Sequence, residues 1–141
     1  MARKNYHGAQ FNQSATIVEK AGAAIDDVRN LIMKYDSNGA VVLATAGTDI
    51  PVGIALIEAG YNDISGATAG KVAVGDDVDI LVKDMGVVLA GVAIKKGQEV
   101  AAGAGGKAAI AATGNYVLGI ALDNAQAGEY LNIQIAKYQK N

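Results

Sequence analysis

Two stretches of the chain repeat each other in composition and in order. The run Gly53–Leu56 (GIAL) recurs as Gly119–Leu122, and the segment 75–83 recurs loosely as 128–137. Because both pairs keep the same order, each half of the chain is predicted to carry one copy of the same small unit. The repeated residues include no obvious catalytic side chains, which favours a structural or binding role over catalysis.

A second motif recurs three times and indicates where strands begin. A glycine stands three residues before an apolar residue in the runs 74–78 (VGDDV), 96–100 (KGQEV) and 127–131 (AGEYL). Glycine supplies the positive φ that a tight turn into a strand often needs. Turn signals that follow each other every 8–12 residues or so predict an all-β fold, a small barrel or sandwich of short strands.

The central part of the chain allows two interpretations. Residues 31–35 and 40–45 flank Asp36–Gly39, and the Asn-Gly pair in that turn is a strong hairpin signal. The apolar residues between positions 25 and 35 also have helical spacing, which makes a short helix over 22–34 the alternative. We favour the hairpin over 31–45. Further strands are expected at 52–56, 78–82, 87–94 and 133–135.

The composition divides the chain into an arm and a domain. Residues 1–20 contain few aliphatic side chains and several amides, so they are predicted to form an extended N-terminal arm that becomes ordered only against another surface. Residues 21–141 are predicted to form a single β-rich domain. Its two related halves are expected at about 25–83 and 92–138.

The first half carries an insertion. Gly53 and Gly75 are 22 residues apart, whereas the matching Gly119 and Gly128 are 9 apart, which leaves 13 additional residues at roughly 58–71. Their glycine-rich and polar composition is typical of a loop. A contact surface and a passive surface loop are both open interpretations of this segment.

The core of such a domain would be thin. The chain has 141 residues, with one Phe and no Trp. A chain of this length buries roughly 68–70% of its unfolded surface. Each buried methylene contributes only about 0.8 kcal/mol, so a core of small residues favours additional support from oligomer contacts.

Charge and cysteine content exclude several classes of function. The net charge is −2, made of +2 over residues 1–35, −6 over 36–84 and +2 over 85–141, which does not suit a nucleic-acid-binding protein. The chain has no cysteine, so disulfide and thiolate chemistry are excluded.

The sequence also lacks targeting and membrane signals. The first ten residues lack an apolar signal core, and no apolar run reaches 18 residues. A soluble protein made in the cytoplasm, without a membrane partner, is therefore expected.

The candidate chemical motifs fail on inspection. The glycine-rich run 103–107 has Ala at 101 and 108, where a phosphate-binding loop needs Gly and Ser or Thr. His7 is the only histidine, so a catalytic triad or a histidine metal site cannot be assembled within one chain. Asp76 and Asp77 would point to opposite faces of a strand. We therefore expect no catalytic, cofactor-binding or metal-binding residues and no cofactor, although a hydrolase that uses carboxylates alone is the third hypothesis.

The arm contains a basic and aromatic cluster. Its members are Arg3, Lys4, Tyr6, His7 and Phe11. Aromatic and arginine side chains are enriched at interface anchors. The alternative interpretation of this cluster is a disordered tail.

Several runs resemble one family. They are residues 1–6 (MARKNY), 36–44 (DSNGAVVLA), 50–54 (IPVGI) and 112–122 (ATGNYVLGIAL). Together they resemble tailed-phage head decoration proteins, also called capsid cement proteins, and the likeness covers most of the chain from about residue 25 onward.

The resemblance implies a non-enzymatic structural protein of the virion, made in the host cytoplasm. Such proteins bind the exterior of an assembled capsid and stabilise it, commonly as homotrimers, and their partner is the major capsid protein. The implied contact is the N-terminal arm. Its capsid-binding residues would be Arg3, Lys4, Asn5, Tyr6, His7 and Phe11.

A carbohydrate-binding or adhesive surface module is the alternative from a different class. Such a module needs exposed aromatic side chains on one face. The available residues are Tyr61, Tyr116, Tyr130 and Tyr138, but the chain has no Trp.

Overall fold

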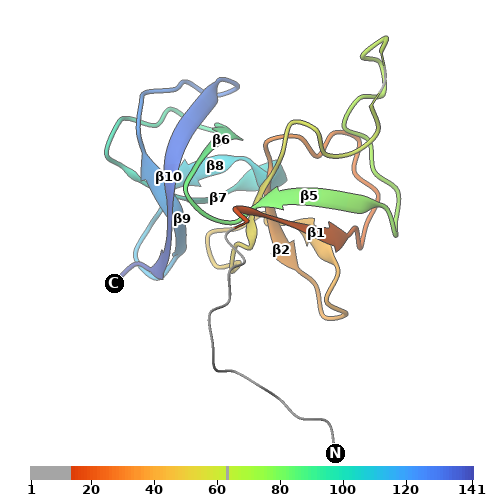
Figure 1. The fold of residues 1–141 in the computed structure, drawn as a ribbon. Helices are drawn as coiled ribbons and strands as arrows, with labels where there is room; N and C mark the ends of the chain where they lie inside the picture. The colour runs from red at the N-terminus through yellow and green to blue at the C-terminus, as the bar shows by residue number, and fades with distance from the viewer. Residues whose placement is uncertain (1–13, 63) are drawn as a thin grey trace, which may run out of the picture.

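The protein is all-β, as predicted. The computed structural model describes residues 14–62 and 64–141, and in these ranges ten strands form two antiparallel five-stranded sheets (Figure 1). The first sheet contains β1 (Thr16–Lys20), β2 (Ile32–Tyr35), β3 (Val41–Leu43), β4 (Gly53–Ala55) and β5 (Asp77–Leu81). The second sheet contains β6 (Met85–Leu89), β7 (Glu99–Ala102), β8 (Ala108–Ile110), β9 (Tyr116–Ala121) and β10 (Tyr130–Gln139). A single 3₁₀ turn, η1 (Ala104–Gly106), joins β7 to β8.

The two sheets have the same topology. The strand orders β1-β5-β4-β2-β3 and β6-β10-β9-β7-β8 are both first-fifth-fourth-second-third within their half. An isolated parallel bridge also recurs, between Ala21 and Val41 in one half and between Ala90 and Ala108 in the other. Each bridge brings the third strand of a half next to the end of its first strand, so each sheet curls toward a closed barrel. The internal repeat is therefore a repeat of fold as well as of sequence.

The segment expected to be an arm contributes a strand. Residues 16–20 form β1, which pairs along its whole length with β5, so the arm predicted over 1–20 is wrong for these five residues. The strands of the first half thus run from 16 to 81 and those of the second from 85 to 139. Residues 1–13 lie outside the described part of the chain.

The hairpin prediction is confirmed and the alternative helix over 22–34 is wrong. β2 and β3 pair with Met33 opposite Leu43, and Gly39 in the turn has φ of 81°. The carboxylate of Asp36 accepts hydrogen bonds from the amides of Asn38 (2.8 Å) and Ala40 (3.0 Å), which fixes the turn. Residues 22–31 are irregular, because their backbone groups bond to distant segments.

The recurring glycine motif is a tight turn with its own side-chain bond. Gly75, Gly97 and Gly128 have φ of 87–89°. The residue after each glycine accepts a hydrogen bond on its side-chain oxygen from the amide three residues earlier. These bonds are Ala73 to Asp76 (2.8 Å), Lys95 to Gln98 (2.7 Å) and Gln126 to Glu129 (2.8 Å). The structure adds a fourth case, in which the Ala112 amide donates to Asn115 (2.9 Å) after Gly114, which has φ of 87°.

The halves are joined by a shared core. The larger buried cluster consists of residues of the second half together with Ile32, Ala44 and Ile54 of the first. The first half keeps a separate core around Met33 and Ile80.

The link between the halves continues at the free edge of β6. The buried Asn30 donates its side-chain amide to the Val87 carbonyl (3.0 Å), and its own carbonyl accepts from the Leu89 amide (2.9 Å). One residue of the first half therefore satisfies two backbone groups at the edge of the second sheet.

The glycines that open the two GIAL runs predict matched effects of substitution. A Cβ at Gly53 would lie closer than 3.0 Å to the Leu81 carbonyl, and one at Gly119 equally close to the Gln134 carbonyl. Because these backbone atoms are held in the sheets, we expect Gly53→Ala and Gly119→Ala each to lower the free energy of unfolding by more than about 3 kcal/mol. Urea denaturation measures this loss.

Gly75→Ala and Gly128→Ala are the matched controls. Both positions have positive φ but no atom within 4 Å of an added Cβ, so only backbone strain of about 1–2 kcal/mol is expected. Equal losses in all four variants would contradict the close approach of the fourth and fifth strands.

The Asn30 contact also predicts a graded series. Asn30 has φ of 60°, which glycine adopts freely. Asn30→Gly removes only the side-chain donor, so the Val87 carbonyl loses this hydrogen bond. We expect the free energy of unfolding to fall by about 1–3 kcal/mol. Asn30→Ala adds backbone strain of about 1 kcal/mol. Equal stability of Asn30→Gly and the unsubstituted protein, by urea denaturation, would contradict the role of the amide.

Candidate functional site

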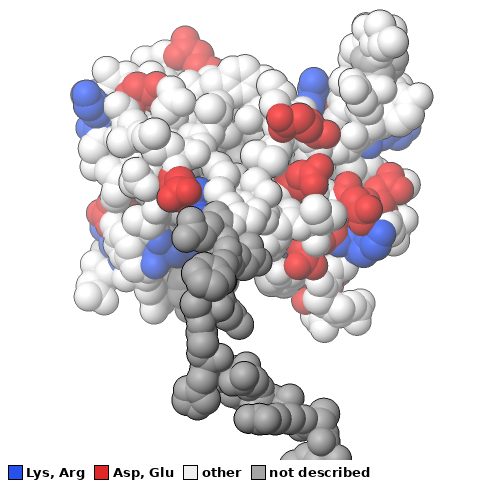
Figure 2. Space-filling view, in the orientation of Figure 1, with Lys and Arg blue, Asp and Glu red and all other residues white. Residues whose placement is uncertain are grey.

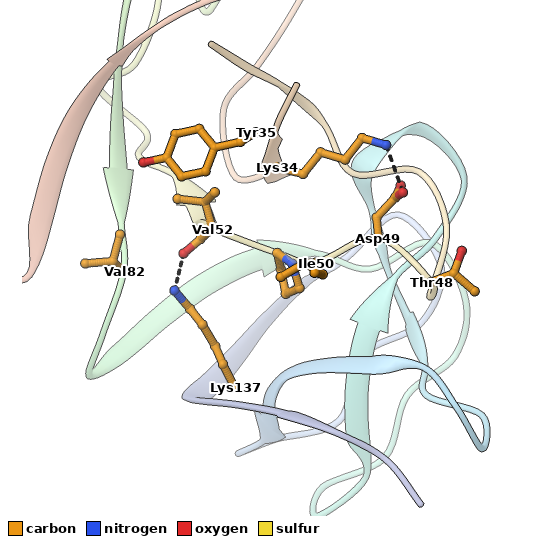
Figure 3. Close-up of a pocket in the computed structure, with 9 residues that line it drawn as sticks. Lys34, Tyr35, Thr48, Asp49, Ile50, Val52, Val82 and Lys137 are labelled. Atoms are coloured by element: carbon orange, nitrogen blue, oxygen red, sulfur yellow. Dashed lines mark hydrogen bonds and ion pairs between the residues drawn. The ribbon is translucent and has the colours of Figure 1, made fainter. Parts of the chain in front are cut away.

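One hollow lies on the seam between the halves, beside the point where the described chain begins. We call it the arm-side groove (Figure 3). It has a volume of about 590 Å³. It is lined by Lys34, Tyr35, Thr48, Asp49, Ile50, Pro51, Val52, Val82 and Lys137. Most of this wall is apolar, and Ile50 and Tyr35 remain 64% and 46% exposed.

A fixed ion pair closes one side of the arm-side groove. The Lys34 ammonium lies 2.8 Å from the Asp49 carboxylate, which also accepts from the amides of Thr45 (2.9 Å) and Ala46 (3.2 Å). Burial by itself raises the pKa of the Asp49 carboxyl, but the bonds from Lys34 and the two amides outweigh it, so the pKa is held below its ordinary value. Both oxygens of the Asp49 carboxylate therefore accept hydrogen bonds, one from Lys34 and the other from the two amides.

A lysine enters the groove from the opposite half. Lys137 of β10 donates its ammonium to the Val52 carbonyl (Figure 3). Burial lowers the pKa of this ammonium. Among the residues that the structure describes, no carboxylate forms an ion pair with Lys137. The groove therefore combines apolar walls with a cation that has a neutral partner.

The described chain starts at the rim of this groove. The amide of Val82, a lining residue, donates to the Ala15 carbonyl (2.8 Å), and β1 begins at the next residue. The predicted contact residues Arg3, Lys4, Asn5, Tyr6, His7 and Phe11 lie outside the described residues, so their role stays a prediction.

A second hollow of about 390 Å³ lies elsewhere between the halves, and we call it the insertion-side groove. Its lining includes Ile57, Met85 and Tyr130, which are 63%, 66% and 62% exposed. A smaller hollow shares Ile57 and Glu58 with it and reaches the base of the insertion. The lining of this groove includes the carboxylate of Glu58 but no lysine or arginine corresponding to Lys137.

The predicted insertion is a projecting loop with a closed base. The Tyr61 amide donates to the Lys71 carbonyl (2.8 Å), and the Gly70 amide donates to the Tyr61 carbonyl (2.8 Å). Beyond this base the loop extends away from both sheets, at the upper right of Figure 1. Ile64 in this loop is fully exposed. A loop so placed is available for contact, and its role stays a prediction.

The four tyrosines proposed for a carbohydrate site do not form one face. Tyr61 and Tyr130 line the two neighbouring hollows at the base of the insertion. Tyr138 lies eight residues farther along β10 than Tyr130, which is roughly 25 Å at the rise of a strand. There its hydroxyl donates to Glu99 (2.6 Å). This separation disfavours a single aromatic platform.

The acidic residues of the first half are spread over its surface. Figure 2 shows more acidic than basic side chains over the half that contains β1 and β5. Asp76 accepts the Ala73 amide in its turn, whereas Asp77 pairs with Lys20 (2.6 Å), so the two adjacent carboxylates have different partners. Within the described ranges, no three or more His, Cys, Asp or Glu residues are placed to hold a metal ion. The same ranges contain no helix with the length and apolar character that a bilayer crossing requires.

The sequence did not reveal the arm-side groove. Its lining residues come from β2, the segment 48–52, the end of β5 and the end of β10. The strand expected at 133–135 is in fact ten residues long, and Lys137 lies in the part that was not predicted. An alternation of apolar and polar residues over 130–135 was visible, but no local signal places Lys137 against Val52.

Asp49 predicts a specific acid sensitivity. Because its folded pKa is lowered, its contribution to stability is complete above the unfolded value of about 3.9 and is lost as the pH falls through the lower folded value. We expect Asp49→Asn to lose less free energy of unfolding than the unsubstituted protein between about pH 5 and pH 2. Lys34→Met, which removes the partner ammonium, should also reduce this pH dependence. Urea titrations across this range measure it, and identical pH profiles for all three proteins would contradict the assignment.

Comparison with known proteins identifies a shared fold. No family model and no curated protein sequence matches the chain. A solved structure that is similar to it is the N-terminal base of the head fiber protein gp8.5 of bacteriophage phi29. The match has a TM-score of 0.58 at 22% sequence identity and covers 88% of this chain and 97% of the other. The chain therefore shares its fold with that base over most of its length.

Proposed function

We propose that this chain is a non-enzymatic structural protein of a virion that binds the outer surface of an assembled capsid and stabilises it. The observation that carries the proposal is the shared fold with the base of a phage head fiber, which extends over almost all of both chains. The sequence resemblance to head decoration proteins supports the same class on different grounds, because it depends on particular runs of residues.

The proposed partner is the major capsid protein, and the proposed assembly is a homotrimer. A symmetric trimer presents the same surface to three equivalent capsid sites. Once one subunit is bound, the second and third contacts form at high effective concentration, so modest contacts per subunit give firm attachment. A ligand that binds only the assembled shell stabilises that shell by mass action.

The proposed contact is the segment from Ala2 to Phe11. It contains Arg3 and Tyr6, residue types that anchor interfaces well, together with the cation Lys4. The residues directly after it are held to the domain, since Ala15 bonds to Val82 and β1 pairs with β5. A contact made by the segment would therefore be transmitted to the first sheet.

Deletion of residues 2–11 tests the proposal. We expect the shortened protein to keep its fold, because the deleted residues precede β1, and to lose at least about tenfold in affinity for empty capsids, equivalent to about 1.4 kcal/mol. Co-sedimentation with expanded capsids measures the affinity. Two controls are a protein whose residues 2–11 are replaced by a Gly-Ser segment of equal length and the loop variant Ile64→Ser. Unchanged coating of capsids by the deleted protein would overturn the arm as the contact.

A further inference from the structure

The arm-side groove lies next to the first described residues, and the chain that precedes them is a candidate occupant. We propose that residues 8–13 seat in this groove, with the Phe11 ring packed against Tyr35, Ile50 and Val82. This divides the proposed arm into a proximal anchor, residues 8–13, and a distal part, residues 1–7, that is free to reach a partner. The role of the distal part rests on the proposed function, whereas the seating of the anchor does not.

Connectivity brings this segment to the groove. Ala15 is hydrogen-bonded to the lining residue Val82, and Ser14 is turned back on the strand by bonds of its hydroxyl with Thr16 (2.9 Å to the carbonyl and 3.2 Å from the amide). Phe11 is three residues before Ser14, so its Cα lies within about 10 Å of that residue. A tethered segment this close competes for the groove at an effective concentration of millimolar or more.

The chemistry of the groove matches residues 8–13. The segment reads Gly-Ala-Gln-Phe-Asn-Gln and carries no charge, so it brings no ion of its own into the groove. The groove leaves Ile50 and Tyr35 largely exposed, and Phe11 is the only phenylalanine in the chain. A buried aromatic ring on these apolar side chains removes the exposed surface from water.

Lys137 separates the proximal from the distal residues. Its ammonium has three donors, and the Val52 carbonyl accepts one of them. A backbone carbonyl of the segment or a side-chain oxygen of Asn12 or Gln13 supplies a further acceptor. Residues 1–7 carry Arg3 and Lys4 and no carboxylate, so the same ammonium repels them. The groove therefore favours the neutral part of the arm.

A tryptophan at position 11 tests the seating directly. The chain contains no Trp, so the emission of a Phe11→Trp variant comes from that position alone. In the free, full-length protein we expect blue-shifted emission and acrylamide quenching at least threefold weaker than in a peptide of residues 1–15 with the same substitution. Ile50→Lys in this background places a second cation in the groove and should restore the peptide values.

Ile57→Lys is the matched control. Ile57 is 63% exposed and lines the other groove, so this change has the same chemistry and similar exposure but should leave the emission blue-shifted. Thermal unfolding of each variant confirms that the fold is intact.

Several results would overturn the proposal. They are peptide-like quenching of Phe11→Trp in the free protein, emission that is insensitive to Ile50→Lys, and burial that disappears on dilution, which would indicate the arm of a second copy. Burial of the tryptophan only after capsids are added would also overturn it, while leaving the proposed capsid binding intact. A seated tryptophan in a protein that, like the unsubstituted chain, does not bind capsids would contradict the proposed capsid binding while leaving the seating intact.

Discussion

The packing of the first half into the core of the second is the interaction on which the rest of the structure depends. Three residues of the first half, Ile32, Ala44 and Ile54, pack in the same buried cluster as the core residues of the second half. Asn30 binds the free edge of β6. Two curled sheets that meet along such a seam cannot fill its ends, which is where the two larger grooves lie. The contact that makes the molecule one body therefore also makes its recessed surfaces.

The two copies differ at the position through which the first half packs into the second. Ile32 pairs with Ile54 across β2 and β4, and the equivalent pair across β7 and β9 is Glu99 with Ile120. The Glu99 carboxylate accepts the Tyr138 hydroxyl and pairs with Lys140 (3.1 Å), and these bonds hold the pKa of Glu99 below its ordinary value. The second half therefore carries a charged, hydrogen-bonded group at the position where the first half buries an apolar side chain against its neighbour. Tyr138 near the end of β10 and Lys140 just beyond it hold this carboxylate in place.

Local signals predicted local structure well. The hairpin of β2 and β3 was recognised from Asn38 and Gly39, and the fold class followed from the spacing of glycine turns. The helical spacing near Ile25 misled, because Ile25 exchanges backbone bonds with Val72 and is held as an isolated bridge instead. Strand β1 and the groove were missed because they depend on distant residues: β1 pairs with β5, from Thr16 opposite Leu81 to Lys20 opposite Asp77, and Lys137 contacts Val52. The candidate arm was recognised from its composition, and residues 1–13 lie outside the described part of the chain, so its role stays a prediction.

The duplicated fold explains how a chain without apparent chemistry could bind a shell firmly. Ordering a backbone residue costs roughly 1–2 kcal/mol, so an arm of thirteen residues that becomes ordered only on a capsid would lose much of its contact energy. An arm whose residues 8–13 are already seated would leave only seven to be ordered, which reduces that cost by roughly 6–12 kcal/mol per subunit. The groove proposed as the seat lies where Lys137 of one half reaches Val52 of the other, so both copies contribute to its wall. If the proposed seating holds, the duplication would do more than enlarge the core, since the seam between the copies would also order part of the arm in advance.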